Sequence, residues 1–114
     1  MKIGLLGFGF MGRAFMHSLN NLNDYYNDVP KNISVKGVAT SSISSSRSID
    51  LERYNIEKIY NNSNHLLEDD EIDSIYIASP NKHHYEHIIK AIKKNKNILC
   101  DKPLTINYKQ SNEI

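Results

Sequence analysis

The sequence predicts a doubly wound α/β fold, in which helices cover both faces of a parallel sheet. Short apolar runs alternate with segments of helical periodicity, and the first run ends in closely spaced glycines. Such an alternation favours parallel strand pairing through right-handed crossovers. A length of 114 residues suits a single domain with a modest core.

The first half of the chain contains two predicted strands. Residues 1–6 form an apolar run typical of a buried strand, and residues 34–40 form the second. Between them, apolar side chains from Met11 to Leu22 recur at helical spacing. Residues 20–32 are polar and include a proline, so we expect an extended loop there.

The middle of the chain is less regular. Residues 41–48 are rich in serine, which suits either a flexible linker or a loop around a phosphate. We expect a short helix over residues 49–54, and Ser63 is placed to cap another that reaches Leu67. Residues 73–79 predict a third strand, which the following proline ends.

The clearest predicted helix spans residues 83–95. Its expected apolar face consists of Tyr85, Ile88, Ile89 and Ile92. Residues 97–100 predict a fourth strand, and residues 106–114 have the pattern of a beginning helix. A sheet of four strands would leave one edge and one face uncovered, so we expect association, such as a homo-oligomer, through that surface.

Composition excludes several classes of partner. Fourteen basic and thirteen acidic residues leave a formal charge of +1, which gives no reason to expect nucleic acid or an anionic membrane. No apolar run approaches the roughly 18 residues of a membrane helix. The single cysteine, Cys100, excludes an internal disulfide and fits a reducing compartment, so we expect a cytoplasmic protein.

The glycine-rich turn is the most informative motif. It matches the pattern G-x-G-x-x-G and consists of Gly7, Phe8, Gly9, Phe10, Met11 and Gly12. Between a strand and a helix, this pattern indicates a Rossmann-type dinucleotide site, because glycines permit a tight turn, close approach of a pyrophosphate and helix–strand contact. The helix N-terminus adds free N–H groups for the phosphates. The alternative is a glycine turn of another α/β protein.

The end of the second strand bears on the choice between NAD and NADP. A carboxylate is expected about 20 residues past the glycines to hold the ribose 2′-hydroxyl. Here the strand ends in Thr40 and Ser41, and no acid follows until Asp50. The missing acid and the nearby Arg47 favour NADP. The alternative is that Thr40 and Ser41 bond the ribose of NAD.

Two further motifs follow the third and fourth predicted strands. They are Ser79-Pro80-Asn81 and Asp101-Lys102-Pro103. In an open parallel sheet, ligands bind beyond the carboxyl ends of the strands, so both motifs are expected to face the cofactor crevice.

The order of these three motifs resembles the N-terminal domain of the Gfo/Idh/MocA oxidoreductases, which are relatives of glucose–fructose oxidoreductase and inositol 2-dehydrogenase. The resemblance covers nearly the whole chain. It implies that residues 1–114 are an incomplete NAD(P)-binding Rossmann domain, the N-terminal portion of an enzyme whose substrate domain is absent. The intact enzyme would transfer hydride between nicotinamide and a sugar- or polyol-like hydroxyl, and this portion alone would be inactive.

The resemblance also implies roles for individual residues. The glycine turn would hold the pyrophosphate, and Thr40 and Ser41 the adenosine ribose. The nicotinamide side would be lined by the residues that match the family's Thr-Pro-Asn-x-x-His segment, namely Ser79, Pro80, Asn81 and His84. Lys102 matches the lysine of the family's Glu-Lys-Pro motif and would polarise a substrate hydroxyl or carbonyl. Asp101 stands where the family usually has glutamate.

Several of these residues also have an interpretation without a functional role. Lys102 is alternatively a surface lysine, and Cys100 is expected to be a small core residue. His83 and His87 have the spacing of a metal pair, but no third ligand follows at a suitable spacing, so no metal site is expected. As a whole, the chain is alternatively a non-catalytic dinucleotide-binding or sensing module, or, more remotely, a methyltransferase that uses S-adenosylmethionine.

Overall fold

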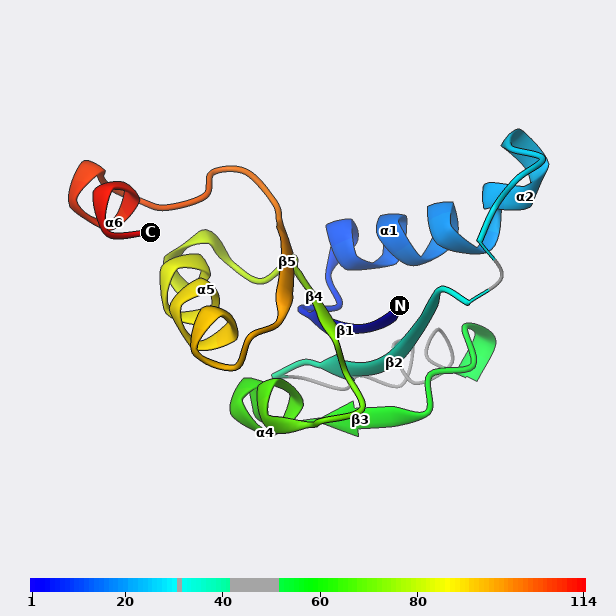
Figure 1. Ribbon diagram of the computed structural model, residues 1–114, viewed down its shortest axis with the longest axis horizontal. Helices are drawn as coiled ribbons and strands as arrows, with labels where there is room; N and C mark the ends of the chain where they lie inside the picture. Colours follow the sequence, from blue (N-terminus) through cyan, green and yellow to red (C-terminus); the bar gives the residue numbers. More distant parts are fainter. Residues whose placement is uncertain (31, 42–51) are drawn as a thin grey trace.

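The computed structural model describes residues 1–30, 32–41 and 52–114. Five parallel strands form one sheet in the order β3-β2-β1-β4-β5 (Figure 1). The strands are β1 (Lys2–Leu6), β2 (Ser34–Ala39), β3 (Lys58–Tyr60), β4 (Ser74–Ile77) and β5 (Asn97–Cys100). The chain fills the sheet outward from β1 in both directions, which confirms the predicted doubly wound fold.

Helices lie on both faces of this sheet. They are α1 (Phe10–Asn20), α2 (Leu22–Tyr25), α4 (Ser63–Glu68), α5 (His84–Lys93) and α6 (Tyr108–Glu113), with a single 3-10 turn, η1 (Asn81–His83), before α5. Figure 1 shows α1 on one side of the sheet and α4 and α5 on the other. None of the helices in the described part of the chain is long and apolar enough to cross a membrane.

Alternating strand side chains build a separate core on each face. Leu5 and Tyr76 belong to the cluster on the α1 side, together with Met16 of the helix itself. Leu6 belongs to the opposite cluster, which also contains Ile88 of α5. Because successive strand residues point to opposite faces, short apolar runs fill both cores, as buried parallel strands require.

The edge strand β3 was not predicted, and the expected count of four strands was wrong. Its three residues are too short to show an alternating pattern. It pairs with β2, where Val38 lies opposite Ile59. A side-chain contact beyond the strand supports it, because Lys58 Nζ donates to Asp69 Oδ2 at 2.8 Å.

Two local predictions before β4 also need correction. The extended loop expected over residues 20–32 contains α2, which closes with a backbone bond from Tyr26 N–H to the Leu22 carbonyl. The helix over residues 63–68 exists, but its N-cap is Asn62, not Ser63. The Asn62 side chain accepts the Asn64 N–H at 2.8 Å.

The helix expected over residues 83–95 begins at His84 and ends at Lys93. Its buried face agrees with the prediction only in part, because Ile88 is buried but Ile92 is 47% exposed. The buried residues are His84, His87, Ile88 and Ala91. The last three of these residues follow His84 by three, four and seven positions, so all four lie on the face of the helix that packs against the sheet. Two of the four are histidines, which an apolar pattern does not include.

The remaining predictions fall on the termini and on the serine-rich segment. The strand over residues 97–100 is confirmed, and the helix expected to begin after residue 106 is α6. The expected helix over residues 49–54 is described only from Glu52, where two helical residues are present. The serine-rich loop, with Arg47, lies outside the described residues.

Candidate functional site

A pocket of about 760 Å³ opens at the carboxyl ends of the central strands. The glycine turn after β1 forms its floor, and the ends of β2 and β4 contribute the residues beside it. The amino-terminal ends of α4 and α5 form the opposite wall. This is the edge of a doubly wound sheet where ligands bind.

The three glycines of the turn differ in how closely other atoms pack around them. Gly7 has a φ of +100°, and a Cβ there would lie 2.5 Å from the Ala78 carbonyl oxygen. A Cβ on Gly12 would collide with the Gly7 carbonyl, which lies where α1 packs on the turn. A Cβ on Gly9 would meet nothing within 4 Å. The turn is therefore tight at Gly7 and Gly12, and its backbone is open at Gly9.

The N-terminus of α1 adjoins this open backbone. Gly9 is the N-cap, has no capping side chain, and accepts the first helical bond from the Arg13 N–H at 3.1 Å. The N–H groups before Arg13 in the first turn have no acceptor within the helix, and the positive end of the helix dipole lies at these groups. No acidic side chain occupies this turn. The arrangement suits an anion such as a pyrophosphate.

The β2 end of the pocket is polar and uncharged in the described residues. Thr40 and Ser41 line it, and Asn61 and Asn62 lie across from them after β3. Thr40 N–H donates to the Tyr60 carbonyl at 3.1 Å, which holds the end of β2 to the end of β3. Thr40 and Ser41, the two described residues directly after β2, carry no carboxylate.

The wall from α5 carries the charged groups. Glu86 is the single carboxylate among the described lining residues, and it accepts from Lys90 one helical turn away. Lys90 Nζ also donates to Asn64 Oδ1 at 2.8 Å, which ties α5 to the start of α4. These paired charges leave the β2 end of the pocket free of negative charge.

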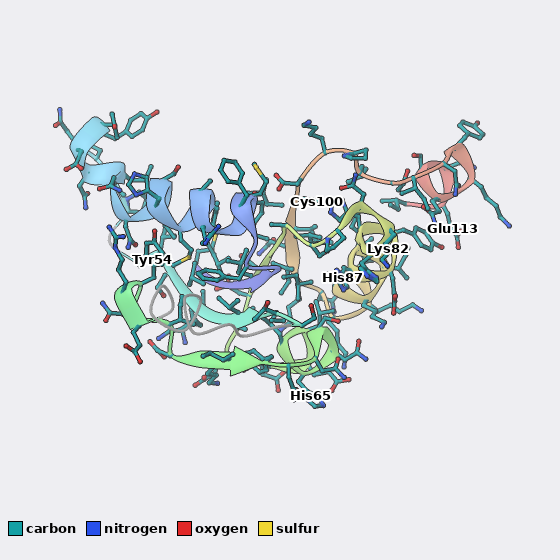
Figure 2. The ribbon with its side chains drawn as sticks, turned by 180° about the vertical axis from the view of Figure 1, so that it is seen from behind. Tyr54, His65, Lys82, His87, Cys100 and Glu113 are labelled. Carbon is teal, nitrogen blue, oxygen red and sulfur yellow. The ribbon has the colours of Figure 1, made fainter. Side chains whose placement is uncertain are left out.

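Ser79 and Pro80 bring the end of β4 into the pocket. Ser79 Oγ lies 3.0 Å from Nδ1 of His87, a lining residue of α5 whose side chain is largely buried. Figure 2 labels His87 among the side chains between α5 and the sheet. Burial, and next the electrostatic interaction with His83, lower the pKa of His87 to about 4, so His87 is neutral at neutral pH.

His84 lies beneath the pocket and not in its lining. Its side chain is fully buried. Nε2 lies 2.7 Å from the Ser79 carbonyl oxygen, and Nδ1 lies 2.9 Å from the Pro103 carbonyl oxygen. The residue that was expected to face the cofactor therefore contacts the loop after β4 and the loop after β5 at once.

The motif after β5 lies at the same edge of the sheet but outside the pocket lining. Asp101 N–H donates to the Ile77 carbonyl, and its carboxylate accepts from Tyr76 OH, both at 2.9 Å. Lys102 and Asn81 are exposed, and neither lines the pocket. The structure thus groups residues 7–11 of the glycine turn with Thr40, Ser41, Ser79 and Pro80 in the pocket lining. The predicted residues outside this lining are Gly12, Asn81, His84, Asp101, Lys102 and Pro103.

Cys100 behaves as the core residue that was expected. It is half-buried and packs against the core on the α5 side. Burial, and next the nearby Asp101 carboxylate, raise the pKa of its thiol to about 11, so the nucleophilic thiolate is disfavoured. In the described residues, no group of three or more histidine, cysteine or acidic side chains is arranged to hold a metal ion.

Sequence reasoning missed one side of the pocket. The missed lining residues are Asn61, Asn62, Ser63, Asn64, His83, Glu86, His87 and Lys90. The asparagine-rich stretch is a signal for a turn, but it points to the pocket only once β3 is known to end immediately before it. For the residues of α5, the histidines on its buried stripe were the available signal.

The open sheet, the glycine turn and the free helix N-terminus define a Rossmann-type nucleotide-binding domain. The sequence model of the GFO_IDH_MocA family, described as an oxidoreductase family with an NAD-binding Rossmann fold, matches residues 1–114. The chain belongs to this Gfo/Idh/MocA oxidoreductase family.

Individual relatives agree with this membership. The chain is 28% identical over 108 residues to myo-inositol 2-dehydrogenase of Thermotoga maritima, which covers 94% of the chain and 29% of the relative. It is 29% identical over 118 residues to glucose-6-phosphate 3-dehydrogenase of Bacillus subtilis, covering 96% of the chain and 28% of the relative. The chain therefore spans less than a third of the length of these proteins.

Solved structures share the fold over almost the whole chain. An NAD-binding oxidoreductase from Klebsiella pneumoniae superposes with a TM-score of 0.86 at 32% identity, covering 99% of this chain and 30% of the other. Levoglucosan dehydrogenase in complex with NADH gives a TM-score of 0.87 at 27% identity, covering 98% and 30%.

Proposed function

We propose that the pocket binds NAD or NADP, with the pyrophosphate on the glycine turn. The observation that carries the proposal is Gly9, whose missing side chain leaves open space beside the free N-terminus of α1. A pyrophosphate needs this close approach to backbone N–H groups. The tight packing at Gly7 and Gly12 holds the turn in that shape without a ligand.

The remaining pocket residues divide between the two ends of the dinucleotide. Thr40 and Ser41, with Asn61 and Asn62 opposite, are suited to the adenosine ribose because they offer hydroxyl and amide groups. Ser79 and Pro80 are suited to the nicotinamide side, with Asn81, Asp101, Lys102 and Pro103 as the next groups along that edge. The bound cofactor supplies the redox chemistry, and the chain binds and orients it.

For the intact protein, we propose an NAD(P)-dependent dehydrogenase that acts on a sugar- or polyol-like hydroxyl. The names of the inositol and glucose-6-phosphate dehydrogenases support this proposal. Lys102 is the proposed catalytic residue, since its exposed ammonium at the strand edge is free to approach a substrate oxygen. This chain, which spans less than a third of those relatives, is proposed to bind the cofactor and to lack activity alone.

A preference for NADP is supported by the absence of a carboxylate at the end of β2 in the described residues. Nothing there repels a 2′-phosphate, and Arg47 follows in sequence as a cation to receive it. One relative, 32% identical over 57 residues, is the D-xylose 1-dehydrogenase (NADP(+)) of Hypocrea jecorina.

A titration of this chain with NADH and with NADPH, followed by nicotinamide fluorescence, tests both parts of the proposal. We expect both to bind and NADPH to bind more tightly. Arg47→Ala should remove the difference without abolishing NADH binding. Tighter NADH binding would contradict the NADP preference, and binding of neither would contradict the proposed function of this chain. S-adenosylmethionine serves as the control ligand and should not bind.

Two wider proposals accompany this one. The first is association between copies of the chain through the apolar face of β4 and β5 beside α1. A second hollow of about 380 Å³ lies there, and its lining is almost entirely apolar. Leu99 belongs to this lining and is 57% exposed. The second is a reducing, cytoplasmic location, which is supported by the single cysteine with its raised thiol pKa.

A further inference from the structure

His87 lines the pocket but belongs to none of the three cofactor motifs of the sequence. His87 is in the middle of α5, three residues past the histidine of the matched segment, and its side chain is only 8% exposed. A polar ring in such a place needs a hydrogen-bond partner. Its hydrogen-bond partner is the hydroxyl of Ser79, a lining residue at the end of β4.

Ser79 is held from two sides. Its carbonyl oxygen lies 2.7 Å from His84 Nε2, and its hydroxyl lies 3.0 Å from His87 Nδ1. The first contact fixes the backbone of the loop, and the second fixes the rotation of the side chain. A serine hydroxyl otherwise rotates among three staggered positions, so this contact selects one direction for the oxygen in the pocket.

The neutral state of His87 keeps positive charge away from this contact. A neutral imidazole carries one proton on one of its two nitrogens, so the tautomer of His87 decides whether Nδ1 accepts from the Ser79 hydroxyl or donates to it. An imidazolium would force Nδ1 to donate and would place a positive charge beside the pocket. The low pKa of His87 prevents this at neutral pH.

We propose that His87 is a positioning residue for the bound dinucleotide, acting through the Ser79 hydroxyl. Ser79 makes the contact with the cofactor, and His87 holds its oxygen in the direction that the contact requires. This inference rests on the proposed function, because it needs a dinucleotide in the pocket.

A double-mutant cycle on NADPH affinity tests the proposal. We expect Ser79→Ala and His87→Phe each to weaken binding about tenfold, as loss of one oriented hydrogen bond does. Because both act on one contact, His87→Phe should change binding less than about twofold when Ser79 is already alanine. His87→Asn, which keeps a polar side-chain atom near the place of Nδ1, should recover most of the affinity.

The controls separate positioning from folding. His65→Phe changes an exposed histidine of α4 that does not line the pocket, and this variant should bind like the unaltered chain. Thermal unfolding of each variant shows whether the fold persists. In ¹⁵N spectra of the ligand-free protein, Ser79→Ala should shift the Nδ1 resonance of His87 and leave that of His65 unchanged.

Several results would overturn the inference while the proposed function stands. Additive losses in the cycle, an unchanged affinity in His87→Phe, or no rescue by a folded His87→Asn would each remove His87 as a positioning residue. An unshifted Nδ1 resonance would show that the contact is absent in solution. Failure of the unaltered chain to bind NADH or NADPH would instead overturn both proposals.

Discussion

The carboxylate of Asp69 joins the edge strand β3 to the segment between α4 and β4. It accepts hydrogen bonds from Lys58 Nζ and from Tyr60 OH, and its other oxygen accepts the Glu71 N–H at 2.8 Å. The bond from Lys58 is the largest cause that holds the pKa of Asp69 well below its ordinary value, followed by the bond from Tyr60. Burial, and then the bond to Asp69, raises the pKa of Tyr60 to about 12.

We predict that Asp69→Asn lowers the free energy of unfolding at pH 7 by about 1 kcal/mol, a modest value for a partly solvated cluster. A depressed carboxyl pKa stabilises the fold above the unfolded value of about 4, and this contribution is lost as the pH falls through the folded pKa. The difference between the two proteins should therefore be constant from pH 5 to 8 and shrink below pH 4.

Chemical denaturation across this pH range measures the effect. Asp70→Asn, at the exposed neighbouring carboxylate, is the control and should change stability little at any pH. A loss in Asp69→Asn that persists undiminished at pH 3 would contradict the electrostatic origin of the effect.

The strand β5 shows how the sheet leaves one surface open. Its side chains alternate, so Ile98 packs toward the α5 core whereas Leu99 points to the α1 side, into the second hollow. There α1 covers the centre of the sheet (Figure 1), and its partly buried Phe15 reaches only as far as Tyr76, with ring centres 4.3 Å apart. The apolar surface of β5 beyond it remains exposed.

We predict concentration-dependent association of this chain in sedimentation velocity experiments, and its loss in Leu99→Lys, because a charge on that face opposes burial. Ile92→Lys is the matched control: Ile92 is 47% exposed on α5 but does not line the hollow, so this variant should associate like the unaltered chain. A monomer at all concentrations, or equal effects of the two lysines, would contradict association through this face.

Elements with a clear apolar pattern could be predicted from the sequence, and two short elements without one could not. The strands around the glycine turn and the helix before β5 were found because apolar spacing repeats over many residues. The three-residue strand β3 and the four-residue helix α2 carry no such repeat. Their stability comes from contacts with neighbouring elements, such as Lys58 with Asp69, which no local pattern reveals.

The candidate site likewise has one part that could be predicted from the sequence and one part that could not. The glycine turn could be predicted because its glycine pattern reflects local requirements, namely a tight turn, close approach of a pyrophosphate and contact between helix and strand. The contribution of α5 could not, because His87 enters the pocket through a packing stripe shared by polar and apolar residues. His84 matched a motif, but only the fold shows that its ring contacts backbone carbonyls of two loops.

The molecule as a whole collects every strand-to-helix turn at one edge of the sheet. The chain winds outward from β1 in both directions, so the turns after β1 and β4 lie side by side, and Gly7 contacts the backbone of Ala78. Two cores on opposite faces hold the sheet rigid beneath this edge. The pocket is therefore a consequence of the topology, and Gly9 marks the point where we propose that a ligand reaches the backbone.

Gly9→Ala tests this account most directly. The residue has a negative φ of −81° and open space around the added methyl group, so we predict unchanged or slightly raised stability. Because the methyl group would occupy the place proposed for the pyrophosphate, NADPH affinity should fall at least about tenfold. Gly7→Ala, the control at a positive φ, should instead lower stability. A stable Gly9→Ala protein that binds NADPH like the unaltered chain would contradict the dinucleotide site.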